Sequence, residues 1–146
     1  MKKMVATLIL VMSTSMLHAG DMGIGAGLIY TGSAGLTIEK SMGHNVVGLA
    51  VFGHSLHVDY LWHNDHLIPS GSLELPVFYG LGLAVHSSEG DDEDSEINLG
   101  IRAPLGVSWY GLMDHVETFF ELVPTYSLGD HGGYDTGYGL GLRYHF

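Results

Sequence analysis

The sequence predicts an all-β protein: an eight-stranded antiparallel transmembrane β-barrel preceded by a cleaved signal peptide. Three observations carry this prediction. Bulky apolar residues alternate with small or charged ones in about eight segments, and a period of two is the period of a β-strand. Glycine is abundant, at 22 of 146 residues, whereas charged residues make up only 14%. Beyond the leader, no apolar stretch reaches the roughly 20 residues of a membrane-spanning helix.

The N-terminal stretch MKKMVATLILVMSTSMLHAG has the three parts of a secretory signal peptide. Two lysines precede an apolar run over residues 4–12, and a polar patch then leads to the small residue Ala19. The apolar run is too short to span a bilayer as a helix. We therefore expect export and cleavage near Ala19, with a signal peptide over residues 1–19 and one outer-membrane barrel domain over residues 20–146.

Removal of the signal peptide leaves three basic residues against 16 acidic ones, a formal charge of −13. So acidic a chain excludes binding to nucleic acid through its phosphates. The chain has no cysteine, which excludes disulfides and a lipobox-type lipid anchor. An exported protein without disulfides needs another source of stability, and a closed ladder of backbone hydrogen bonds supplies one.

The expected strands follow one another with short, glycine-rich or polar turns between them. Most approach the 9–11 residues that a tilted strand needs to cross a bilayer, and an even number suits a single-chain membrane barrel. The second and third strands are short, so their register is the weakest part of the assignment. In order, the strands span 22–31, 33–40, 45–52, 55–63, 73–86, 97–110, 115–127 and a closing strand after residue 133, with a turn-rich stretch over 64–72.

The strands share one orientation of their two faces. In the sixth, Leu99 and Ile101 lie on a continuous bulky face, whereas Gly100 and Arg102 lie on the other. The second face is largely glycine, alanine and a few charges, which would be a poor coat toward water. We therefore expect the bulky face to contact lipid and the other to line the lumen. A soluble periplasmic ligand-binding barrel, with the faces reversed, is the alternative.

Two prolines interrupt the expected ladders. Pro76 lies early in the fifth strand and Pro104 lies in the middle of the sixth. Proline cannot donate a ladder hydrogen bond, and a closed barrel has no edge strand to place it on. We therefore expect each proline to lie at a bulge or near a rim.

Charged residues on the inward face form the first candidate site, with Glu39, His57 and His145 nearby. An unpaired buried ion costs several kcal/mol, and side chains can fill the lumen of an eight-stranded barrel. We expect a plug of salt bridges and hydrogen bonds, a narrow gated ion path being the alternative. The expected members of this network are Arg102, Arg143, Glu74, Glu117, Glu121 and Asp59.

The run SSEGDDEDSE over residues 87–96 is the most unusual segment. If the N-terminus is periplasmic, the loop after the fifth strand is extracellular, and its acidic residues are expected to be solvated. Weak binding of a divalent cation is an alternative, because such cations prefer oxygen ligands. Contact with a basic extracellular protein is another. The spacing does not match an EF-hand, and the candidate cation ligands are Asp91, Asp92, Glu93 and Asp94.

One constellation is considered as a catalytic site. His86 and Ser88 stand two residues apart where the fifth strand ends, with Glu96 at the end of the acidic run. A serine nucleophile, a histidine base and an orienting carboxylate would suit a barrel that deacylates lipid A. The surrounding negative charge would repel anionic lipid, so no enzyme activity is expected. No cofactor is expected either, since none of the ten histidines stands in a strong metal-binding spacing.

Four stretches, LHVDYLWHN (56–64), LGIRAPLGVSW (99–109), FFELVPTYSL (119–128) and GYGLGLRYHF (137–146), resemble a family of small, uncharacterised outer-membrane β-barrels. These are comparable to the eight-stranded OmpA-type transmembrane domain. The resemblance spans about residues 22–146. It implies residence among the lipids of the outer membrane of a diderm bacterium, and no catalytic residues. The ending with Tyr144 and Phe146 is similar to the signal that the barrel assembly machinery reads.

The sequence therefore predicts a structural or surface-interaction role through the extracellular loops of a barrel with a plugged lumen. A lipid-modifying barrel enzyme and a soluble ligand-binding barrel remain the alternatives. Neither a ligand nor an oligomeric state follows from the sequence.

Overall fold

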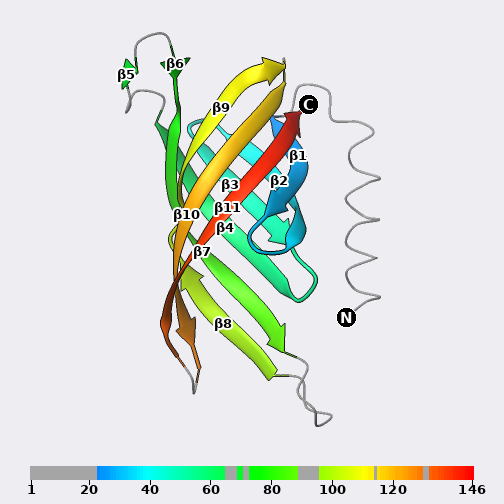
Figure 1. Cartoon of the computed structure of the whole chain (residues 1–146), viewed down its shortest axis with the longest axis vertical. Helices are drawn as coiled ribbons and strands as arrows, with labels where there is room; N and C mark the ends of the chain where they lie inside the picture. The colour runs from blue at the N-terminus through cyan, green and yellow to red at the C-terminus, as the bar shows by residue number, and fades with distance from the viewer. Residues whose placement is uncertain (1–22, 65–68, 71–72, 89–95, 114, 130–131) are drawn as a thin grey trace.

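The computed structural model describes residues 23–64, 69–70, 73–88, 96–113, 115–129 and 132–146 (Figure 1). The predicted signal peptide and the acidic residues 91–94 lie outside this range, so both stay predictions. The strands are β1 (Ile24–Tyr30), β2 (Ala34–Met42), β3 (Asn45–Val51), β4 (Ser55–Asn64), β5 (Pro69–Ser70), β6 (Leu73–Glu74), β7 (Val77–Ser88), β8 (Glu96–Arg102), β9 (Leu105–Met113), β10 (Val116–Leu128) and β11 (Tyr134–His145).

The strands form a closed antiparallel barrel whose wall has eight strand positions. Neighbours in the wall are neighbours in sequence, and β11 pairs with β1 to close the ring. β8 and β9 together occupy one strand position in the wall, because both pair with β7 on one side and with β10 on the other. β5 and β6 form a separate two-stranded sheet. The predicted fold class is confirmed, although the turn-rich stretch over 64–72 holds part of this extra hairpin. Within the described residues, no helix is long and apolar enough to cross a membrane.

The observed strands differ from the expected ones in a few places. β2 reaches Met42, and its seven paired positions with β3 give these two strands a continuous register. Ser87 and Ser88 continue β7, and Glu96 begins β8, so three residues of the expected acidic loop belong to strands. Backbone pairing between β7 and β8 extends the ladder to these positions. The charge of this segment suggests a loop, because charge carries no information about backbone pairing.

The expectation of a bulge at Pro104 is wrong. Gly82 pairs with Arg102 and Tyr79 pairs with Leu105, so both strands advance by three residues across the break. The ladder is interrupted at 103–104 without a change of register. The carbonyl groups there are still used, because Gly80 N donates to Pro104 O at 2.8 Å. Pro76 immediately precedes β7, and its carbonyl accepts a hydrogen bond from Ser108 N at 2.9 Å.

The two ends of the barrel can be told apart by the chain termini. Phe146 N donates to Ile24 O and Ser41 N donates to Gly23 O, so both ends of the described domain lie at one rim. We call this the terminal rim. The turns at 31–33 and 52–54 and the far ends of β7, β8, β10 and β11 lie at the opposite rim, the loop rim (Figure 1).

The register around the barrel gives it a defined stagger. A walk through directly paired residues leaves β11 at Tyr134 and returns to β11 at Tyr144, ten residues further along. Such a stagger tilts the strands and sets the width of the lumen. The residues on this path all lie on the outer face, and in order they are Tyr134, Tyr126, Ile101, Leu83, Val58, Leu49, Ile38, Ala26 and Tyr144.

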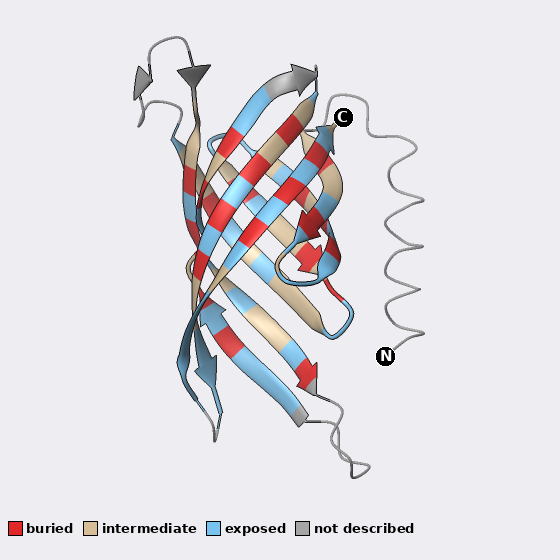
Figure 2. Cartoon of the chain, in the orientation of Figure 1, coloured by how far each residue is buried: buried red, intermediate tan, exposed pale blue. Residues whose placement is uncertain are grey.

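The outer face of the wall is apolar, and the inner face carries most of the buried side chains. Buried and exposed residues alternate along β10 and β11, as the coloured bands of Figure 2 show. The middle of the outer wall is aliphatic, with Leu81 and Leu83 each more than half exposed. Exposed aromatic side chains flank it: Tyr30, Tyr126, Tyr134 and Tyr138 toward the loop rim, and Tyr60, Tyr79, Trp109, Tyr144 and Phe146 toward the terminal rim.

Glycines make room inside the barrel for the large side chains of neighbouring strands. A Cβ at Gly139 would lie 2.8 Å from Glu121 Cγ, and one at Gly141 would collide with the ring of Phe119. A Cβ at Gly82 would collide with the Asp59 carboxylate. The small residues of the inward face therefore leave the space that its bulky and charged residues fill.

This complementarity predicts different effects at two glycines that both pair with Asp59. Gly82→Ala inserts a methyl group against the Asp59 carboxylate, whereas at Gly48 the nearest atom to a new Cβ is 4.0 Å away. We expect Gly82→Ala to lower the free energy of unfolding by about 1–3 kcal/mol. Gly48→Ala is the matched control and should change it by less. Urea unfolding of the folded barrel in detergent measures both, and equal effects would contradict the packing account.

Candidate functional site

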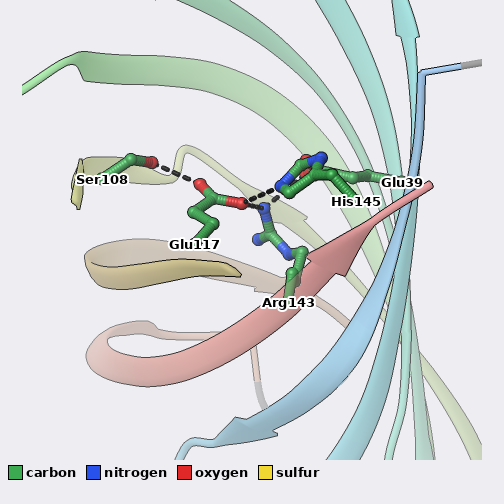
Figure 3. A network of polar contacts seen from close by, with 5 residues as sticks. All are labelled: Glu39, Ser108, Glu117, Arg143 and His145. Atoms are coloured by element: carbon green, nitrogen blue, oxygen red, sulfur yellow. Dashed lines mark hydrogen bonds and ion pairs between the residues drawn. The ribbon is translucent and has the colours of Figure 1, made fainter. Parts of the chain in front are cut away.

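Two clusters of charged side chains lie inside the barrel, one on each side of the ring of Phe119. The cluster nearer the terminal rim, the Arg143 cluster, contains Glu39, Ser108, Glu117, Arg143 and His145 (Figure 3). The cluster nearer the loop rim, the Arg102 cluster, contains His57, Asp59, Arg102 and Glu121.

The strand register builds the Arg143 cluster. Glu117 on β10 is directly opposite Arg143 on β11, and Gly25 on β1 is opposite both Glu39 and His145. Because Gly25 has no side chain, Glu39 and His145 can meet across it, and His145 Nε2 lies 3.8 Å from Glu39 Oε1. Glu39 on β2 and His145 on β11 are thus close together at the seam where β11 pairs with β1.

Arg143 is the cation that holds this cluster together. Its Nη1 contacts Glu39 Oε2 and lies 3.0 Å from Glu117 Oε2. Its guanidinium carbon lies 3.7 Å from the centre of the Phe119 ring, a cation–π contact. Glu117 is fully buried and uses both oxygens, since Ser108 Oγ donates to Oε1 at 2.5 Å and His145 Nε2 lies 3.0 Å from Oε2.

The Arg102 cluster is built in the same way on the opposite side. Gly82 on β7 is opposite both Asp59 and Arg102, which leaves space for their contact. Arg102 Nε lies 3.0 Å from Asp59 Oδ1, and Arg102 Nη2 lies 3.3 Å from Glu121 Oε1. The third nitrogen, Nη1, donates to His57 Nδ1. The guanidinium thereby contacts groups from two other strands, His57 and Asp59 on β4 and Glu121 on β10.

Two separate cavities lie within the described part of the barrel. A cavity of about 550 Å³ opens at the loop rim and reaches His57 and Arg102, and a smaller one of about 190 Å³ reaches Glu39 and His145 from the terminal rim. The two share no lining residue. The interior of the barrel also holds a cluster of buried apolar side chains: Ile29, Val46, Ala50, Phe52, Leu61, Phe78 and Phe119.

The structure brings most of the expected network residues into contact. Arg102 meets Asp59 and Glu121, and Arg143 meets Glu117. The side chain of Glu74 lies outside the described part, and its backbone belongs to the small β6 strand rather than to the wall. Glu39, His57 and His145, which the sequence placed only near the network, make direct contacts within it.

Two residues that contact the Arg143 cluster from inside the barrel, Ser108 and Phe119, were not predicted from the sequence. The alternation along β10 places Phe119 on the same face as Glu117 and Glu121, and this spacing could have revealed it.

The other predicted residues make none of the ion pairs or hydrogen bonds described for the two clusters. His86 lines the loop-rim cavity, and the backbone of Ser88 pairs with that of Glu96 at the ends of β7 and β8. Tyr144 and Phe146 lie exposed at the terminal rim with ring centres 5.1 Å apart. Among the described residues, the group with metal-ligand geometry is Glu39, Glu117 and His145, whose candidate ligand atoms all lie within 4.8 Å of one another.

Comparisons with known proteins support the fold. The chain is similar to the crystal structure of the N-terminal β-barrel domain of OprF from Pseudomonas aeruginosa, with a TM-score of 0.56 and 19% sequence identity. The match covers 84% of this chain and 95% of that domain. At this identity the likeness concerns the architecture alone, that of a small antiparallel β-barrel. A scan of protein-family models and a search of curated proteins found no match.

The geometry of the Arg143 cluster predicts that this arginine is needed for stability. Arg143→Met leaves Glu39 and Glu117 buried without a guanidinium, and loss of one partner of a buried ion pair costs about 3–5 kcal/mol. We expect that loss in the free energy of unfolding, measured by urea titration in detergent. Lys40→Met is the control, because Lys40 is exposed, and it should stay within about 0.5 kcal/mol of wild type. Equal midpoints for the two variants would contradict this role.

Proposed function

We propose that this chain is a small outer-membrane β-barrel whose lumen is closed by its own side chains, and whose role is structural or surface-interactive rather than catalytic. The single observation that carries the proposal is the orientation of the wall. Large apolar residues cover its outer face, and the buried ions lie inside. In water this arrangement would expose a large contiguous apolar surface, whereas in a bilayer it places apolar atoms against lipid tails.

The distribution of aromatic residues supports the same location. Membrane barrels carry an apolar band flanked at both interfaces by girdles of aromatic residues. The outer wall has an aliphatic middle with four exposed tyrosines toward the loop rim. Toward the terminal rim, three aromatic rings on β4 and β7 contact one another, since the ring centres of Tyr60 and Trp62 are 5.0 Å apart and those of Trp62 and Tyr79 are 5.8 Å apart.

The filled lumen supports a closed barrel rather than a pore. The two cavities enter from opposite rims and end at different ionic clusters. Phe78 and Phe119, each 1% exposed, are buried in the interior of the barrel. Transport of a solute through this lumen would require both clusters and both rings to move. Surface presentation is therefore the better proposal, and the acidic residues 91–94 remain candidates for contact with a cation or a basic partner.

The position of His86 argues against a lipid-modifying enzyme. His86 lines the loop-rim cavity, on the lumen side of β7. A bilayer lipid would lie against the opposite face of the same strand, beside Leu83 and Val85. Deacylation of such a lipid would require its ester to enter the lumen. The lumen-facing position of His86 therefore argues against catalysis at this site.

Cell fractionation tests the location and the closed barrel together. We expect the mature protein in the outer-membrane fraction, where it should migrate differently in a detergent gel before and after boiling, since an intact ladder of hydrogen bonds resists detergent. A soluble periplasmic protein with a single mobility would overturn the proposal. The Arg143→Met variant supplies an internal comparison, because its mobility shift should occur at a lower temperature.

A further inference from the structure

We infer that the lumen contains a binding site for one divalent transition-metal ion, held by Glu39, Glu117 and His145 and reached through the terminal-rim cavity. The inference rests on the barrel fold and not on the membrane location proposed above. Three observations carry it: the spacing of the donor atoms, the net charge of the lumen, and an access route from one rim.

The donor atoms stand at distances that suit a shared ion. His145 Nε2 lies 3.0 Å from Glu117 Oε2 and 3.8 Å from Glu39 Oε1. With metal–ligand bonds of about 2.0–2.1 Å, neighbouring ligands of a tetrahedral ion are about 3.3 Å apart. Small rotations of these three side chains would therefore allow them to share one ion. An imidazole in the set favours zinc-type metals over magnesium or calcium, which prefer oxygen ligands.

The charges of the lumen leave a deficit that such an ion would fill. The enclosed carboxylates of the described wall are those of Glu39, Asp59, Glu117 and Glu121, and their cationic partners are Arg102 and Arg143. Four negative charges thus face two positive ones. Uncompensated charge is costly in a low-dielectric interior, and one divalent cation would cancel the difference. Protons on His145 and on a carboxyl group are the competing means of compensation.

The surroundings of the site have the features of a supported metal centre. Metal-binding carboxylates are usually oriented by a second hydrogen bond, and Ser108 Oγ supplies one to Glu117 Oε1 at 2.5 Å. Arg143 contacts Oε2 of both glutamates, whereas Oε1 of Glu39 faces His145. The 190 Å³ cavity touches Glu39 and His145 and is also lined by His44 and His63, so an ion from the terminal rim would pass further imidazoles on its way.

Zinc titration of the folded mature protein in detergent, followed by calorimetry, tests the inference. We expect saturable binding of one Zn²⁺ per barrel, lost in both His145→Ala and Glu39→Gln, and weakened by about 10-fold in Ser108→Ala. His86→Ala is the matched control, since this histidine lines the opposite cavity, and it should bind like wild type. Heat-dependent gel mobility of each variant verifies that it is folded, and two independent ligand variants keep the test valid if one fails to fold.

Two results would overturn the inference. A folded wild-type barrel without saturable Zn²⁺ binding would mean that protons balance the lumen charge. Binding that survives both ligand variants but disappears when Asp91, Asp92, Glu93 and Asp94 are replaced by their amides would assign the ion to the acidic run instead. Neither result bears on the fractionation experiment, so the metal site and the membrane location are tested independently of each other.

Discussion

The space inside an eight-stranded wall is the constraint on which the rest of this structure depends. Strands with the observed stagger enclose a lumen only as wide as the side chains that fill it. Several large inward residues therefore have a glycine opposite them on a neighbouring strand. Gly82 lies between Asp59 and Arg102, and Gly25 lies between Glu39 and His145. Glycine in these strands weakens the local backbone, but it allows the charged groups to meet.

The contacts between these charged groups organise the rest of the barrel interior. Two arginines each collect carboxylates from different strands, and Phe119 packs against one of them. Such clusters join β2, β4, β8, β10 and β11 through side chains in addition to the backbone ladder. The contact of Arg143 with Glu39 links the last strand to the second, so the seam of the barrel is held by an ion pair as well as by the pairing of β11 with β1.

The sequence predicted the fold and the faces well, because both depend on a period of two that is visible in one strand at a time. The inward positions of Arg102, Glu117 and Arg143 follow from this alternation alone. The partners do not, because they depend on register between strands. Whether Arg143 meets Glu39 or Glu121 is decided by the pairing of β11 with both β1 and β10, which no single segment encodes. The uninterrupted register across Pro104 was missed for the same reason, since a neighbouring strand supplies the missing ladder contacts.

The central claim is that the bulky face of the wall contacts lipid, and the fluorescence of its two tryptophans tests it most directly. The chain has two tryptophans, Trp62 and Trp109, and both lie on the outer face toward the terminal rim. After reconstitution into vesicles, lipids brominated near the headgroup should quench their emission strongly, and lipids brominated near the chain ends should quench it less. Emission that neither lipid quenches would show that this face does not contact the bilayer, and the assignment of the inner and outer surfaces would then be contradicted.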